Sequence, residues 1–264
     1  GGLHVGMVGG AYAAPNTCVP PRQRDTSAIP TFAFPATVAP ANGGAAGTYM
    51  LGAALHERLT QEVLGEAYAG GLLCQEITSQ KIGLIHSGII GLLLGEGSTL
   101  GELYRDNKNR PVIMALKPRA APEVHIGLGR QAPDAMDPTR IILEEPLLAL
   151  NVPNLDLDIY TLLDDRWVRL VTLTVDLVLG LGLEINAQNQ VHLIANPVDS
   201  WIKNVRASTG DILNQTPEEI ATAVPELLAA FLTQFAPSLD QTFDLPALQG
   251  FALRDVRFKG MEQT

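Results

Sequence analysis

The most regular feature of the chain is an alternation of apolar residues with polar or small ones over residues 167–185. Helical spacing would scatter these aliphatic residues around a cylinder, so the pattern predicts a strand with one apolar face. At about 3.3 Å per residue the strand would span about 60 Å, whereas ordinary strands have about 5–6 residues. Twist must curl so long a strand, and Gly180 and Gly182 on its other face would ease the bend. We therefore expect one continuous, curved strand with its apolar face formed by Val171, Leu173, Val175, Leu177, Leu179, Leu181, Leu183 and Ile185.

Shorter alternating stretches predict further strands around this one. Asp164, Asp165 and Arg166 form a polar turn before the long strand, and residues 186–189 form another turn after it. Consecutive strands joined by short polar turns give an antiparallel meander rather than strand–helix–strand units. The additional strands are expected at 1–13, 111–118, 123–129, 139–150, 154–163 and 250–258.

Two segments have helical periodicity. Over 48–73 the apolar residues recur at spacings of three and four, with Thr48 as a suitable N-cap and Gly70 and Gly71 at the end. A second helix is expected over 217–242, with Thr216 as its cap. Residues 14–47, rich in Pro, Ala and Gly, predict an extended and irregular segment. The apolar faces include Leu51, Leu55, Leu59 and Val63 in the first helix, and Leu227, Leu228, Phe231 and Phe235 in the second.

Composition narrows the class of protein. Apolar residues make up 46% of the 264 positions, which is enough for a large core, and aromatic residues only 5%. A formal net charge of −10 repels phosphate backbones, so nucleic acid is not an expected partner. The longest apolar run, 82–95, is shorter than the ~20 residues that a membrane-spanning helix needs, so no transmembrane segment is expected.

These elements predict an α+β fold in which a long, highly twisted antiparallel sheet rolls around a long helix, with a second long helix near the C-terminus. In order, the segments MLGAALHERLTQEVLGEAYAGGLLCQEIT, IHSGIIGLLLGEGSTL, RPVIMALKPRAAPEVHIGLG, LNVPNLDLDIY and FDLPALQGFALRDVRFKG resemble the C-terminal barrel of the bactericidal/permeability-increasing protein family. That family belongs to the tubular lipid-binding superfamily. The resemblance spans residues 48–260 and implies one barrel over 48–264, with residues 1–47 packed on it and a partner barrel expected before residue 1.

The resemblance also implies a ligand and a location. Members of the superfamily hold lipid acyl chains in the tube, but the acidic composition argues against carrying over antibacterial activity. Cys18 and Cys74 lack metal-binding spacing, so they are either two free thiols or one disulfide. The export implied by the family favours the disulfide and a periplasmic, outer-membrane-associated or extracellular location.

Catalytic and metal-binding patterns are weak. The chain has no GxSxG motif, His86-Ser87 is only a loose echo of one, and His56-Glu57 lacks a second histidine at the spacing zinc would need. His56, His125 and His192 are expected at the surface. Asp156 and Asp158 share a strand face, which is either a calcium site or a solvated face, and we favour the solvated face. We expect no enzyme, no cofactor and no metal.

The apolar faces carry the functional hypothesis, which is binding or transport of lipid or lipid-like apolar ligands in a bacterial envelope or extracellular setting. The alternative is a structural or interaction module of a cell-surface assembly, with a filled core and an envelope or cell-surface protein as its partner. The expected ligand lining is Leu59, Val63, Leu173, Val175, Leu177, Leu179, Leu181, Leu183, Leu227, Leu228, Phe231 and Phe235.

Overall fold

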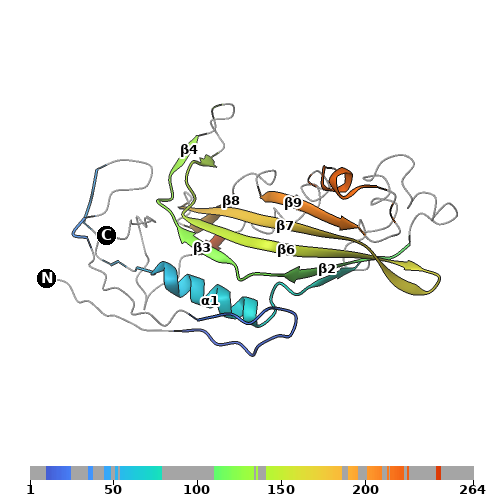
Figure 1. Ribbon diagram of the computed structural model, residues 1–264. Helices are drawn as coiled ribbons and strands as arrows, with labels where there is room; N and C mark the ends of the chain where they lie inside the picture. The colour runs from blue at the N-terminus through green and yellow to red at the C-terminus, as the bar shows by residue number, and fades with distance from the viewer. Residues whose placement is uncertain are drawn as a thin grey trace.

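The structure is a computed structural model that describes residues 10–24, 35–37, 45–48, 51–52, 54–78, 110–133, 135, 141–185, 190–195, 201–209, 213, 215–222, 225 and 242–244. The described part is mostly antiparallel sheet with little helix, and the sheet is strongly curled (Figure 1). Its elements are α1 (Glu57–Ala69), β1 (Glu76–Thr78), β2 (Val112–Pro118), β3 (Glu123–Ile126), β4 (Gln131–Pro133), β5 (Ile141–Leu143), β6 (Leu148–Leu163), β7 (Arg166–Ile185), β8 (Gln190–Ala195), β9 (Ile202–Thr209) and β10 (Thr242–Asp244).

The prediction of one continuous long strand is confirmed. Strand β7 runs unbroken over 20 residues and pairs along its length with the 16-residue β6. Asp164 and Asp165 connect the two strands with φ values of 43° and 60°. Two central residues with positive φ are the signature of a type I′ turn, whose twist matches that of the paired strands.

Strands β6 and β7 form the spine of the sheet, and shorter strands flank them in two groups (Figure 1). Strand β2 pairs with β6 and β9 with β7 toward the β6–β7 turn, and we call this region the β2–β9 half. Strand β3 pairs with β6 and β8 with β7 at the other end, which we call the β3–β8 half. The strand order is β1-β2-β6-β7-β8-β10, with β3 and β9 off this path.

The two halves meet at a pair of strand irregularities. The β6–β7 register shifts between Val152 and Leu155, and the β7–β9 register shifts between Thr174 and Asp176. Asn154 lies in the first irregularity with φ 51°. Bulges of this kind bend a strand and increase its local twist. The sheet therefore turns its direction here, which contributes to the half-barrel shape.

The Asp176 carboxylate links both irregularities. Its Oδ1 accepts the backbone N–H of Asn154 at 2.8 Å, and its Oδ2 accepts the side-chain amide of Asn204 at 2.6 Å. Asn204 has φ 50°, and Arg206 donates to the Asn154 side chain at 2.6 Å. These bonds lower the pKa of Asp176, the Asn154 N–H contributing most.

The first helix is shorter than predicted. Helix α1 begins after His56, whose Nδ1 accepts the N–H of Arg58 at 3.1 Å, so the prediction of Thr48 as its N-cap is wrong. A side-chain acceptor that serves the first free N–H groups is what starts a helix. The predicted end is confirmed, since Gly70 caps the helix and Gly71 follows with φ 82°.

Other predicted elements have mixed outcomes. Residues 217–222 are helical, and Thr216 and Glu219 form a reciprocal capping box at their start. The predicted strand 139–150 is wrong as one element, because Glu145 and Pro146 separate β5 from β6, and Glu145 instead accepts the N–H of Leu128. The predictions for residues 1–9, 82–95 and 250–258 and for most of 223–242 lie outside the described residues.

Candidate ligand-binding face

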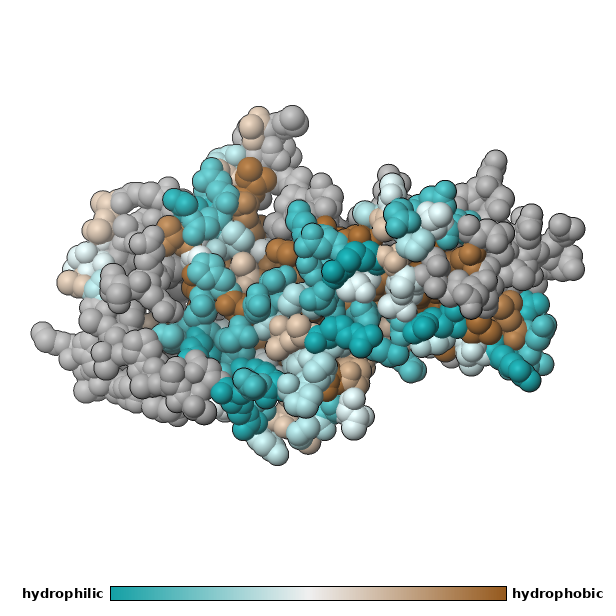
Figure 2. All heavy atoms as spheres, viewed as in Figure 1, coloured by the Kyte–Doolittle hydropathy of each residue, from teal (hydrophilic) through white to brown (hydrophobic). Residues whose placement is uncertain are grey.

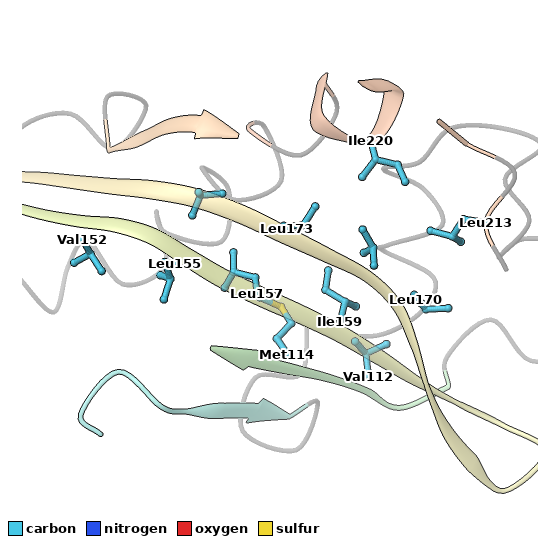
Figure 3. Packing of buried hydrophobic residues seen from close by; sticks show 12 residues of the cluster. Val112, Met114, Val152, Leu155, Leu157, Ile159, Leu170, Leu173, Leu213 and Ile220 are labelled. Carbon is cyan, nitrogen blue, oxygen red and sulfur yellow. The ribbon is translucent and has the colours of Figure 1, made fainter. Parts of the chain in front are cut away.

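The apolar face of the β2–β9 half is packed. Leu157 and Leu173 pair across β6 and β7, and Leu173 is only 1% exposed. Ile220 of the 217–222 helical segment and Leu213 cover this part of the sheet (Figure 3). The buried cluster consists of Val112, Met114, Val152, Leu155, Leu157, Ile159, Leu170, Val171, Leu173, Val175, Leu213 and Ile220.

The same face continues into the β3–β8 half with different surroundings. Here the strand register places three pairs of leucines directly opposite each other. All six side chains are half-buried rather than buried. The face therefore continues from the packed cluster, which Leu150 still contacts, as an aliphatic strip of half-buried leucines. The opposed pairs are Leu148 with Leu181 and Leu150 with Leu179 across β6 and β7, and Leu183 with Leu193 across β7 and β8.

The residues predicted to line a ligand site are thus divided. Leu173 and Val175 lie in the packed cluster, and the half-buried Leu177 packs against it. Leu179, Leu181 and Leu183 form the β7 part of the half-buried strip. On α1, Leu59 is half-buried and Val63 is 47% exposed. Leu227, Leu228, Phe231 and Phe235 lie outside the described residues.

Helix α1 lies along the free edge of β3. The Gln61 side-chain amide accepts the N–H of Val124 and donates to the carbonyl of Pro122, both at 2.7 Å. Glu57 accepts the N–H of Ile126 at 2.7 Å. These side chains satisfy the edge groups that a further strand would otherwise pair with, which protects the edge from aggregation.

The outer face of the same sheet contains buried carboxylates, so the expectation of a solvated face there is wrong. Asp156 and Asp158 are 5% and 3% exposed. Asp158 accepts hydrogen bonds from Lys117 at 2.7 Å and Thr172 at 2.5 Å, and Asp156 from Arg119 and Thr174. Burial alone raises the pKa of Asp158, but the bonds from Lys117 and Thr172 outweigh it, and the net pKa lies below the ordinary value.

The hydrogen bonds of Asp156 and Asp158 argue against a calcium site at these two residues. The carboxylate oxygens of Asp156 and Asp158 already accept ammonium, guanidinium and hydroxyl donors. Across the described ranges, no group of three or more His, Cys, Asp or Glu residues is placed to hold a metal ion. The aspartates are therefore better explained as acceptors for basic side chains of the sheet.

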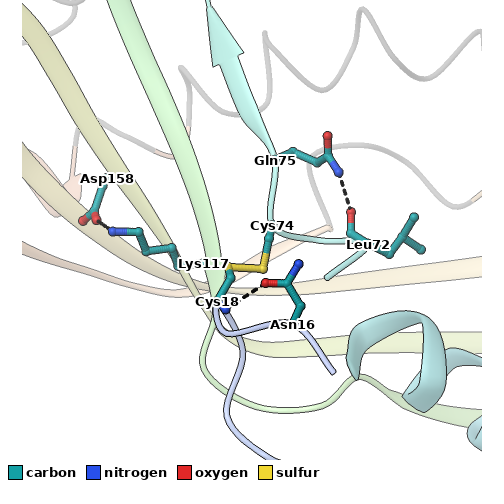
Figure 4. The surroundings of a disulfide bond; sticks show 7 residues. All are labelled: Asn16, Cys18, Leu72, Cys74, Gln75, Lys117 and Asp158. Atoms are coloured by element: carbon teal, nitrogen blue, oxygen red, sulfur yellow. Dashed lines mark hydrogen bonds and ion pairs between the residues drawn. A yellow bond between two sulfur atoms is a disulfide. The ribbon is translucent and has the colours of Figure 1, made fainter. Parts of the chain in front are cut away.

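The predicted disulfide between Cys18 and Cys74 is present and joins positions 56 residues apart (Figure 4). It connects the N-terminal segment to the end of α1. The side chain of Asn16 accepts the N–H of Cys18 at 2.9 Å, and the Asn16 N–H donates to the carbonyl of Ala69 at 2.8 Å. The irregular segment is thus attached to the C-terminal end of the helix.

Glu66 of α1 strengthens the same attachment. Its carboxylate, 3% exposed, accepts two hydrogen bonds from Arg24 and one from the N–H of Ala13. The Arg24 bonds, followed by that of Ala13, lower the pKa of Glu66. Gly65 makes room for Arg22, because a Cβ there would lie 2.1 Å from the Arg22 guanidinium carbon. Glu66 had no distinguishing feature in the sequence, although two arginines in an irregular segment, Arg22 and Arg24, are a weak signal for an acidic partner.

The described histidines lie on β3, on β8 and at the start of α1. His125 is exposed, as predicted, and its Nδ1 lies 3.1 Å from Glu57. His192 is half-buried, 3.9 Å from Glu184. His56 caps α1, and His86 and Ser87 lie outside the described residues. Among the described helices, none has the length and hydropathy to cross a bilayer.

No family model matches the chain, and no curated protein matches it. Among solved structures, the crystal structure of lipopolysaccharide binding protein is similar with a TM-score of 0.41 and 14% sequence identity. The similarity covers 74% of this chain and 39% of that chain. The chain therefore corresponds to less than half of that protein, and a likeness of this size gives no information on what the chain binds.

Proposed function

We propose that the chain binds lipid or lipid-like apolar ligands, without catalysis, on the apolar face of the β3–β8 half. The observation that carries the proposal is the strip of half-buried leucines formed by Leu148, Leu150, Leu179, Leu181, Leu183 and Leu193. A face built from aliphatic side chains alone offers no hydrogen bonds, so it suits a ligand without polar groups along its length.

Energetics support an acyl chain as the occupant. Each methylene buried from water contributes about 0.8 kcal/mol, so a long chain offsets the cost of ordering it on the protein. The strip continues from the packed cluster along the same strands, so the pairing of β6 with β7 supports its backbone. The resemblance in sequence to the tubular lipid-binding superfamily leads to the same ligand class.

The location that we propose is a bacterial envelope or the extracellular space. The Cys18–Cys74 disulfide supports it, because disulfides persist mainly in oxidising compartments. Transport between membranes, which would need ligand release, is the finer form of this proposal.

Binding can be tested with phosphatidylcholine vesicles that carry a fluorescent acyl lipid. The full chain should extract the lipid, and Leu181→Gln should reduce the extracted fraction at least five-fold, because an amide on the strip loses its hydrogen bonds to water when a chain covers it. Glu184→Gln is the matched control, since Glu184 belongs to the opposite face of the same strand. Equal extraction by the Leu181 variant and the wild type would contradict the proposal.

A second function, a structural module of a cell-surface assembly, is favoured by one observation. Leu51, Leu55 and Val63 are exposed beside or on α1, at 62%, 61% and 47%. The three residues lie within one short stretch of the chain, and contiguous exposed apolar surface is typical of protein contact sites. Absence of lipid extraction by the wild type, together with a stable fold, would favour this function over lipid binding.

A further inference from the structure

A hollow of ≈ 260 Å³ lies where the N-terminal segment meets the end of β2, on the opposite side of the sheet from the aliphatic strip. Thr17, Cys18, Val19 and Pro20 form one wall, and Lys117, Pro118 and Arg119 form the other. In Figure 4 the Lys117 side chain starts beside the Cys18–Cys74 bond and extends to Asp158. We propose that this hollow binds a small oxyanion, of the chemistry of a phosphate group.

The cations of the hollow have unused donors. The Lys117 ammonium carries three N–H groups. Asp158 accepts one of them and the Tyr160 hydroxyl is a second partner, which leaves one N–H for an anion. Arg119 bonds Asp156 through Nε at 2.5 Å. In the described part of the chain its two terminal amino groups meet no hydrogen-bond acceptor. A guanidinium held at Nε with both amino groups free can bind an oxyanion bidentately.

The cations are also oriented in advance. Asp156 and Asp158 hold them from the sheet side, and Thr174 and Thr172 bond the second oxygens of these carboxylates at 2.7 and 2.5 Å. Because the aspartates are buried and cannot turn away, Lys117 and Arg119 lose little freedom when an anion binds. The disulfide and Asn16 hold the opposite wall in the same way.

The local charge favours an anion despite the acidic composition. Lys117 and Arg119 contribute +2 and the two aspartates −2, and Arg169, which lies 3.9 Å from Asp158 outside the lining of the hollow, adds +1. The whole chain, in contrast, has a net charge of −10. Lys117 and Arg119 are 44% and 65% exposed, so an anion from solvent reaches them directly. Exposure also means that salt screens the attraction, over about 10 Å at 0.1 M ionic strength.

The test is calorimetric titration of the full, oxidised chain with inorganic phosphate, glycerol phosphate and short-chain phosphatidic acid at low ionic strength. Short-chain phosphatidylcholine, which has no net charge, is the ligand control. Binding of all three anions with similar affinity assigns the site to free oxyanions. Tighter binding of phosphatidic acid than of glycerol phosphate assigns it to a lipid headgroup. Absence of binding by all three anions at millimolar concentration would overturn the proposal.

Variants locate the site. Arg119→Gln should weaken binding at least ten-fold, whereas Lys203→Gln, which removes an exposed cation on β9, should change it less than two-fold. Thr17 is exposed on the rim, so its substitution leaves the buried ion pairs intact. Thr17→Glu should abolish binding by repulsion while Thr17→Gln retains it. Wild-type affinity in Thr17→Glu would contradict the assignment of the hollow, whatever the outcome of lipid extraction.

Discussion

The β2–β9 and β3–β8 halves of the sheet share the same two strands but have different interiors. In the β2–β9 half the alternating residues of β7, such as Leu173 and Val175, are buried in one cluster with Leu213 and Ile220. In the β3–β8 half, Leu179 and Leu181 continue the alternation unchanged, yet they are only half-buried. The comparison teaches that an apolar pattern determines which way a side chain points, whereas the elements above it determine whether the face becomes core or surface.

The outer face differs between the halves as well. In the β2–β9 half, Asp156 and Asp158 lie buried under basic side chains. In the β3–β8 half, the β4–β5 hairpin covers β7, and a Cβ at Gly182 would lie 2.4 Å from Leu143. The space-filling view shows a mainly hydrophilic described surface with small apolar patches (Figure 2). Glycine at position 182 is therefore explained by close packing of the hairpin.

The largest expected effect on the comparison comes from removing the disulfide. Cys18→Ser with Cys74→Ser should lower the free energy of unfolding by about 4 kcal/mol, because closing a loop of this length restricts the unfolded chain. Hydrogen exchange should accelerate first at Val124 and Ile126, whose amides are bonded by α1, and last in the β2–β9 core. Equal acceleration of exchange in both halves would contradict the prediction that the contacts of α1 with β3 are lost before the β2–β9 core opens.

A pair of truncations measures the difference between the interiors directly. Leu173→Ala should destabilise the chain by about 3 kcal/mol, within the range for buried leucines. Leu181→Ala should cost about 1 kcal/mol, because its side chain is already partly hydrated and leaves a smaller cavity. Urea denaturation gives both values. Equal losses would mean that the two halves are packed alike.

The junction between the halves can be weakened at one residue. Asp176→Ala removes the acceptor for both Asn154 and Asn204 and should cost about 1–2 kcal/mol. Asp176→Asn retains one acceptor oxygen and serves as the milder control. Chemical denaturation measures the loss, and nuclear magnetic resonance should show shifts concentrated at residues 152–155 and 202–206. Shifts confined to one strand would indicate that Asp176 does not couple the irregularities.

The smallest effect is the dependence of stability on pH. The pKa values of Asp158, Asp176, Glu66 and Glu145 all lie below their ordinary values in the folded chain. A depressed folded pKa stabilises the fold above the unfolded values of about 4, and this stabilisation is lost as pH falls through the folded pKa. Melting temperatures should be nearly constant from pH 7 to 5 and fall below pH 4. Asp158→Asn should flatten the acid limb, and a rise in stability below pH 4 would contradict these assignments.

Local patterns predicted the features that depend on neighbours in the chain. Alternation predicted β7 and its continuity, Asp164 and Asp165 predicted the turn, and Gly70 and Gly71 predicted the end of α1. Of the capping box formed by Thr216 and Glu219, the sequence predicted the N-cap at Thr216. In each case the periodicity or the cap chemistry acts over a few residues, which is the distance that a sequence pattern describes.

The sequence by itself thus determined which residues form the long strands and which side chains share their apolar face, because strand periodicity alternates the two faces whatever lies above them. Only the tertiary structure decided that α1 runs along the edge of β3 through Gln61 and Glu57, since those polar contacts join residues more than 60 positions apart. It also decided that Asp156 and Asp158 are buried, because their partners are Lys117 of β2 and Arg119, which directly follows β2. Burial and charge pairing depend on long-range register, which alternation along one strand does not encode.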